Sequence, residues 1–148
     1  MKLMTLHVKG TREEALSSLT DRLREHDYVK EPYKESLLLR EEKYPTGLAL
    51  ANSVNIAIPH TEPALVNESV FVMGVPDNVI RFRRIDAPSE DVSVDLIFLL
   101  VIKDPERYLR FLSGLTQNFE NAEFLEQIRH RDTESIRQFL ESGVLESA

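Results

Sequence analysis

Cysteine is absent from this chain of 148 residues, and glycine occurs only five times. Without cysteine, the chain has no disulfide framework, no thiolate zinc site and no cysteine nucleophile. The few glycines form neither a GxxxxGK(S/T) loop nor a GxGxxG loop, so nucleotide binding through those motifs is not supported. Long apolar runs are also missing, because the longest candidate, residues 92–102, is too short and contains Ser93 and Asp95. The N-terminal residues lack a secretory signal pattern, so we expect a mature, cytoplasmic protein.

Negative charge dominates, and the formal net charge is −7. Such an acidic chain is a poor general binder of nucleic acid, and we expect no nucleic-acid partner. The one dense basic cluster, Arg81, Arg83 and Arg84, is interpreted as the solvated face of a strand. The four histidines lack the spacing of metal ligands, so no metal site is expected.

Hydrophobic residues make up 42% of the chain, enough for one domain with a full core over residues 1–148. Residues 11–14 form a capping box that predicts a helix extending to about residue 26, and Pro32 begins a second helix that ends by Lys43. Residues 48–54 show no clear period and are interpreted as a loop or a short turn. The strands are predicted in the segments 3–8, 56–58, 69–75, 79–85 and 92–102.

Three further helices are predicted after the last strand, with Asp104, Asn121 and Asp132 as N-caps. The inner stripe of the first of these helices is expected to contain Leu109, Leu112, Leu115, Thr116 and Phe119. Residues 96–102 are almost wholly apolar, which is typical of a central strand buried on both faces. This order predicts a three-layer α/β/α sandwich, in which helices cover both faces of a mixed sheet of about four to five strands.

His60 follows Pro59 at the end of the apolar run Ile56–Ile58. Proline cannot donate a ladder hydrogen bond, so the strand should end there, and many sheet proteins carry their chemistry at such an end. A neutral imidazole is a competent nucleophile near pH 7. A hydrogen-bonded structural or surface histidine fits the same pattern, and the residues alone leave both interpretations open. His7, His26 and His130 are interpreted as structural or surface residues.

A family resemblance adds to this interpretation. The segment REEKYPTG at residues 40–47, followed by NIAIPH at residues 55–60, resembles the enzyme IIA domain of the phosphoenolpyruvate-dependent sugar phosphotransferase system, fructose–mannitol superfamily. The resemblance continues through VDLIFLLVIK at residues 94–103 and YLRFLSGLT at residues 108–116, and so covers nearly the whole chain. The YPTGL variant and the extra residues between Arg40 and His60 are most similar to the galactitol type.

The resemblance implies a phosphotransferase site without a cofactor or metal. His60 would be the phosphorylated nucleophile, and Arg40 would contact the phosphoryl group. Tyr108 stands where many relatives have a second active-site histidine, and could offer its hydroxyl or simply pack. Thr61 could donate to phosphoryl oxygens or be a plain turn residue, and Glu62 is placed as a supporting or solvated group. The apolar residues Leu48, Leu50 and Val54 could fill the core or form part of a docking surface.

The partners implied by the resemblance are HPr as phosphoryl donor, a cysteine of a IIB protein as acceptor, and the membrane transporter IIC indirectly. The chain itself would not insert into the membrane, and a hexitol, with galactitol first, would be the transported sugar. The alternative is a free-standing regulatory module of the nitrogen-related type, whose phosphorylation state controls a partner protein.

Overall fold

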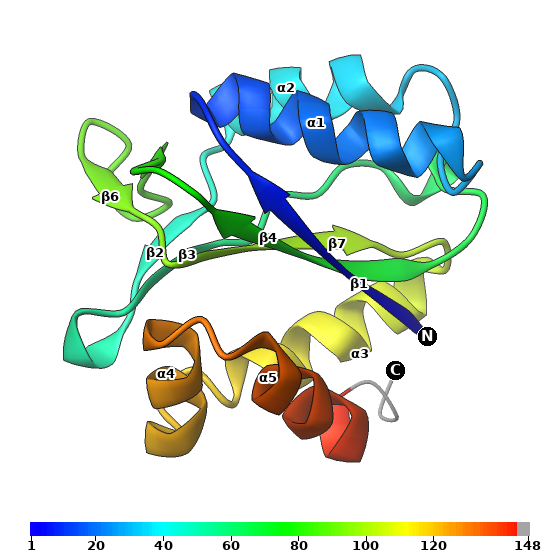
Figure 1. Ribbon diagram of the computed structural model, residues 1–148. Helices are drawn as coiled ribbons and strands as arrows, with labels where there is room; N and C mark the ends of the chain where they lie inside the picture. Colours follow the sequence, from blue (N-terminus) through cyan, green and yellow to red (C-terminus); the bar gives the residue numbers. More distant parts are fainter. Residues whose placement is uncertain (145–148) are drawn as a thin grey trace.

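In a computed structural model of the protein, residues 1–144 are described, and five strands form one mixed sheet in the order β1-β4-β7-β3-β2 (Figure 1). The pairs β1–β4 and β3–β7 are parallel, whereas β4–β7 and β2–β3 are antiparallel. A separate two-stranded sheet joins β5 to β6. The strands are β1 (Lys2–Val8), β2 (Gly47–Ala49), β3 (Asn55–Ala57), β4 (Val70–Pro76), β5 (Arg81–Arg83), β6 (Asp91–Ser93) and β7 (Leu96–Val101).

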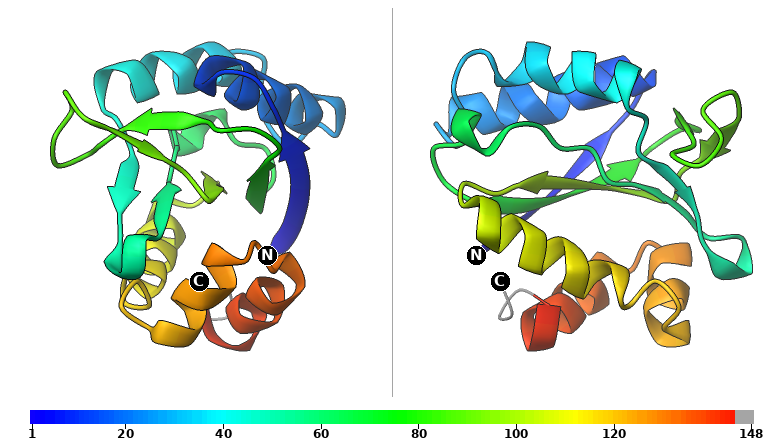
Figure 2. Two further views of the ribbon diagram at one scale, coloured as in Figure 1. Left: turned by 60° about the vertical axis from the view of Figure 1, so that its left-hand side comes forward. Right: turned by 180° about the vertical axis from the view of Figure 1, so that it is seen from behind.

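The helices cover both faces of the five-stranded sheet. They are α1 (Arg12–Glu25), α2 (Tyr33–Lys43), α3 (Pro105–Thr116), α4 (Ala122–Arg129) and α5 (Thr133–Phe139), which continues into a π-helical turn over Leu140–Val144. Helices α1 and α2 lie on one face, and α3, α4 and α5 lie on the other (Figures 1 and 2). The predicted three-layer α/β/α sandwich is therefore confirmed. No helix within residues 1–144 is long and apolar enough to span a membrane.

The core is divided into two layers by the alternation of side chains along β4 and β7. In β7, Ile97 and Leu99 face α1 and α2, while Phe98 and Leu100 face α3, α4 and α5. All six residues of β7 are buried, which confirms the prediction of a central strand covered on both faces.

Local sequence signals set the helix starts. Thr11 Oγ1 accepts from Glu14 N at 3.2 Å and Glu14 Oε1 accepts from Thr11 N at 2.9 Å, so the predicted capping box is formed. Asp104 accepts from Glu106 N at 2.9 Å, with Pro105 at the first helical position. Asn121 and Asp132 cap α4 and α5 in the same way.

The predictions for the segments 48–54 and 92–102 were partly wrong. The segment 48–54 begins with the end of β2, where Leu48 pairs with Ile56, and continues as a 3-10 turn over Ala51–Ser53. A strand of three residues is too short to show a period in the sequence. The segment 92–102 is split between β6 and β7, with Val94 and Asp95 between the two strands. The Asp95 carboxylate accepts from Asn55 N at 2.9 Å.

The predicted inner stripe of α3 was partly wrong. Phe111 and Leu115 are fully buried, and the ring of Phe111 lies 5.2 Å from that of Phe71 in β4. Leu109, in contrast, is 64% exposed, and Thr116 is also exposed. The apolar side chains of this helix occupy one broad arc, and Leu109 and Thr116 lie together at an edge of it, so the spacing alone did not determine which part of the arc faces the sheet.

Candidate active site

His60 lies just past the end of β3, and hydrogen bonds to both neighbouring strands hold the chain there. Ile58 N donates to Thr46 O at 3.2 Å, next to β2, and Leu100 N in β7 donates to Pro59 O at 3.2 Å. Pro59 offers no N–H, so the ladder ends as its sequence predicted. The imidazole is thus carried by a strand end that is fixed on two sides.

The imidazole of His60 has a defined orientation. Its Nδ1 lies 2.9 Å from Ile58 O, and because a carbonyl only accepts, Nδ1 must carry the proton. The neutral ring therefore keeps its lone pair on Nε2. Burial lowers the pKa of His60, and the positive charge of Arg40 lowers it further, while the bond to Ile58 O opposes the shift. The half-buried ring is consequently neutral at pH 7.

A pocket of about 380 Å³ opens beside His60. One wall comes from the end of α2 and the turn that follows it, and the other from the β5–β6 hairpin. The lining residues are Arg40, Lys43, Tyr44, Pro45, Thr46, His60, Ile85 and Pro88. Two larger hollows, of about 550 and 540 Å³, lie along α1 and at the end of β1, and neither includes His60.

The pocket carries two cations without anionic partners. Arg40 and Lys43 each lie 5.6 Å from the centre of the Tyr44 ring, and neither forms an ion pair within the described residues. Both groups are exposed. A guanidinium and an ammonium that line the same pocket as a neutral imidazole can bind a doubly charged oxyanion there.

Tyr108, on α3, packs against the histidine. The two ring centres are 5.4 Å apart and the ring planes are inclined by 46°. Its hydroxyl forms no hydrogen bond with residues 1–144, so the packing role is the one that the geometry supports. Burial raises the pKa of Tyr108 to about 12, against the effect of Arg40, so the phenol stays protonated.

The hydroxyl of buried Tyr33 on α2 is likewise without a hydrogen-bond partner in the described residues, and burial raises the pKa of this phenol.

Thr61 and Glu62 do not line the pocket. Thr61 is 7% exposed, and its hydroxyl lies 2.5 Å from that of Ser36 on α2. Glu62 is exposed and immediately precedes a 3-10 turn over Pro63–Leu65. The structure therefore brings together His60, Arg40 and Tyr108, and directs the hydroxyl of Thr61 toward α2.

The remaining histidines lie away from the pocket. His7 bonds to Asp77 and His130 to Glu126, each at 2.8 Å, and both are exposed. His26 is the C-cap of α1 and His130 that of α4, where we expected helices to end. Within the described residues, no group of three His, Cys, Asp or Glu residues could hold a metal ion.

Of the apolar residues in segment 48–54, Val54 is fully buried and Leu48 and Leu50 pack against the core, so they serve packing.

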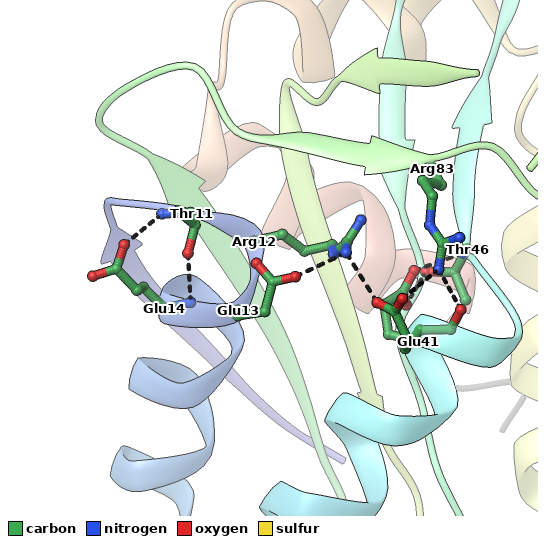
Figure 3. Close-up of polar contacts among 8 residues, drawn as sticks. Thr11, Arg12, Glu13, Glu14, Glu41, Thr46 and Arg83 are labelled. Carbon is green, nitrogen blue, oxygen red and sulfur yellow. Dashed lines mark hydrogen bonds and ion pairs between the residues drawn. The ribbon is translucent and has the colours of Figure 1, made fainter. Parts of the chain in front are cut away.

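The sequence did not reveal the buried pair Glu41–Thr46 (Figure 3). Glu41 Oε2 accepts from Thr46 N at 2.8 Å, and Oε1 accepts from Thr46 Oγ1 at 2.7 Å. Burial raises the pKa of Glu41, whereas the Thr46 bonds and the charges of Arg12 and Arg83 oppose the shift. The Arg-Glu pair and the Thr-Gly turn that contain these residues were visible in the sequence, but their contact was not.

Comparison with known proteins identifies the family. The family profile described as "Phosphoenolpyruvate-dependent sugar phosphotransferase system, EIIA 2" matches residues 2–143. The chain belongs to this family. Among curated relatives, the galactitol-specific EIIA component of the phosphotransferase system from Escherichia coli K12 is 26% identical over 136 residues, covering 92% of this chain and 89% of the relative.

Solved structures of IIA proteins have the same fold. The complex of enzyme IIAMTL and phosphorylated enzyme IIBMTL from Escherichia coli matches with a TM-score of 0.66 and 23% identity, covering 98% of this chain and 94% of that one. The nitrogen regulatory protein IIA-Ntr from Neisseria meningitidis matches with a TM-score of 0.59 and 23% identity, covering 85% and 84%. At these identities the likeness establishes the fold alone. The resemblance to the IIA domain, most like the galactitol type, is confirmed by the family and the curated relatives.

Proposed function

We propose that this protein is a phosphocarrier in which Nε2 of His60 accepts a phosphoryl group from HPr and passes it to a cysteine of a IIB protein. In the first step, the bond between phosphorus and the HPr nitrogen breaks as the bond to Nε2 forms. Nδ1 keeps its proton throughout, and Ile58 O stabilises the positive charge that the ring gains on phosphorylation. The observation that carries the proposal is the free Nε2 of a neutral, oriented imidazole beside two unpaired cations.

Arg40 is proposed to bind the phosphoryl oxygens. Phosphoryl transfer passes through a loose transition state whose charge is spread over the equatorial oxygens, so catalysis depends on positioning and on charge stabilisation. The guanidinium lines the pocket and has no carboxylate partner among residues 1–144 that would compete with a phosphoryl group. Lys43 adds a second positive charge at the same rim.

The surface around the pocket fits a protein partner. Exposed large apolar side chains mark interaction surfaces when they cluster. Tyr44 is 56% exposed and Ile85 is 52% exposed, and both line the pocket. Leu39, directly before Arg40 in the chain, and Leu109, directly after Tyr108, are each 64% exposed. A broad, partly apolar rim around a shallow charged centre suits transient docking of HPr and IIB in turn.

The sugar proposed for the system is galactitol, because the curated relatives covering 92% of this chain are galactitol-specific EIIA components. The protein would act in the cytoplasm as a single IIA domain over residues 1–148, supported by the family match over residues 2–143. IIC would be reached only through IIB. A regulatory role remains the second candidate, because the nitrogen regulatory protein IIA-Ntr has the same fold.

The test is phosphoryl transfer from phosphoenolpyruvate through enzyme I and HPr. Wild-type protein should gain one phosphoryl group that is labile in acid and stable in base, and His60→Ala should gain none. His7→Ala, His26→Ala and His130→Ala are matched controls that should still be labelled. Equal labelling of His60→Ala would contradict the site. Adding a galactitol-type IIB separates the two candidates, since a transport component should transfer its phosphoryl group to the IIB cysteine and a purely regulatory one should retain it.

A further inference from the structure

We infer that Glu41 is a positioning residue, which holds the His60 imidazole and the Arg40 guanidinium in the arrangement that phosphoryl transfer requires. The inference rests on the proposed function for its kinetic consequence. Its structural part, the orientation of the His60 ring, stands on the hydrogen bonds of the described residues alone.

A continuous chain of hydrogen bonds leads from Glu41 to His60. The carboxylate of Glu41 accepts from both the N–H and the hydroxyl of Thr46, at 2.8 and 2.7 Å. The carbonyl of Thr46 accepts from Ile58 N at 3.2 Å. The carbonyl of Ile58 in turn accepts from His60 Nδ1 at 2.9 Å. The placement of Thr46 therefore determines where the carbonyl that orients the imidazole lies.

Glu41 is well suited to hold Thr46, because it is rigid. It is 3% exposed and lies in the last turn of α2, so its side chain has little freedom. A buried carboxylate is stable only when it is hydrogen-bonded and its charge is compensated. The two Thr46 donors supply the hydrogen bonds, and the charges of Arg12 and Arg83 act against the cost of burial, which remains the larger effect on the pKa of Glu41.

The contacts around Glu41 also fix the end of α2, which carries the two cations of the pocket. Arg40 directly precedes Glu41 in α2, and the backbone of Arg40 accepts from Tyr44 N at 2.7 Å. Next to Glu41, the carboxylate of Glu42 pairs with Arg12 at 3.3 Å and with Arg83 at 3.5 Å, and Arg83 also donates to the Glu42 carbonyl. These contacts attach the last turn of α2, which contains Arg40, to α1 through Arg12 and to β5 through Arg83.

Gly47 completes the link to the second wall of the pocket. A Cβ at this position would lie 2.6 Å from the Arg83 carbonyl, so only glycine lets β5 approach so closely. The carbonyl of Gly47 accepts from Ile85 N at 2.9 Å, and Ile85 lines the pocket. The turn after Glu41 thus connects both walls of the pocket to the strand that carries His60.

The experiment compares Glu41→Gln with Glu35→Gln, a matched change at an exposed position of the same helix. Glutamine keeps the size of the side chain but turns an NH2 group toward one Thr46 donor, which then loses its acceptor. The first readout is the tautomer of His60, read from the nitrogen chemical shifts of its ring. Wild type and Glu35→Gln should show the Nδ1–H form, and Glu41→Gln should show a mixture of both tautomers.

The second readout is the rate of phosphoryl transfer from phosphorylated HPr, measured well below the melting temperature of each variant. Loss of a partner that orients a metal-bound histidine typically lowers activity about 10- to 100-fold, and we expect the lower end of that range for this metal-free site. For Glu41→Gln we expect kcat to fall about tenfold while KM for phosphorylated HPr changes less than twofold, since the docking surface is intact. A role limited to fold stability would lower the melting temperature and leave the tautomer and kcat unchanged, and that result would overturn the inference.

Variants of Thr46 keep the inference testable if Glu41→Gln does not fold. Thr46→Ser retains the hydroxyl donor and should stay closer to wild type in both readouts than Thr46→Val, which removes the donor and should shift both in the direction of Glu41→Gln. If folded Thr46→Val shows the His60 tautomer and the kcat of wild type, the hydrogen bonds from Glu41 through Thr46 do not orient His60. If wild type accepts no phosphoryl group at all, the proposed function fails, and the tautomer measurement still decides whether Glu41 orients His60.

Discussion

Replacing Arg40 with alanine tests whether the pocket binds a phosphoryl group. The guanidinium has no ion-pair partner within residues 1–144, so its removal leaves no buried charge behind. A hydrogen bond to a charged group contributes about 1.5–3 kcal/mol, and the exposure of Arg40 places it at the lower end, about 1.5–2 kcal/mol. Since about 1.36 kcal/mol corresponds to a tenfold change in rate, Arg40→Ala should slow transfer about 10- to 30-fold.

The assay is the initial rate of labelling from phosphorylated HPr. Arg40→Lys keeps the charge but loses the planar fork, so its rate should lie between those of wild type and Arg40→Ala. Arg22→Ala, an exposed arginine on α1 outside the pocket, is the matched control and should transfer at the wild-type rate. The melting temperature of Arg40→Ala should stay within about 2 °C of wild type, as for other surface changes. A rate for Arg40→Ala within twofold of wild type would refute the role of this residue.

Three further outcomes are expected. Because burial lowers the pKa of His60, the imidazole stays mostly neutral at pH 6.5. The rate of phosphoryl acceptance should therefore be unchanged at that pH and decline only at lower pH. A midpoint of the rate profile above pH 6.5 would show that the ring is not desolvated. Phe111→Ala, at a buried position of α3, should lower the free energy of unfolding, measured in urea, by about 3–5 kcal/mol. Leu109→Ala, at an exposed position, should lower it by no more than about 0.5 kcal/mol. Similar losses for the two variants would mean that a different side of α3 faces the sheet. Tyr108→Phe should transfer within twofold of wild type and Tyr108→Ala several-fold more slowly, whereas equal losses would assign the function to the hydroxyl.

The strand end at His60 and the layer order of the fold could be predicted from the sequence because both depend on local signals. Pro59 ends the ladder wherever the strand lies, and the apolar run of β7 indicates burial on both faces without reference to its neighbours. The capping residues of the helices act within a single turn, so they are equally visible. The role of Arg40, in contrast, came only from the family resemblance.

The rest of the site depends on contacts between distant segments. Ile85 and Pro88 reach the pocket because β5 packs against Gly47, and nothing in residues 79–85 indicates that pairing. The sequence makes Thr61 a candidate donor, but its hydroxyl lies beside that of Ser36, which is 25 residues earlier in the chain. Glu41 would be placed on the surface by any rule based on residue type, since carboxylates are seldom buried unless they are paired.

The proposed carrier function requires the phosphoryl group to form a bond to Nε2 of one particular histidine. Phosphorus and nitrogen NMR of the phosphorylated protein, with 15N-labelled histidine, reports which nitrogen of which ring is bonded to phosphorus. We predict a single phosphohistidine at His60 with coupling between phosphorus and Nε2, because Nδ1 is occupied by its bond to Ile58 O. A phosphoryl group on Nδ1 of His60, or on His7, His26 or His130, would contradict the assignment to Nε2 of His60.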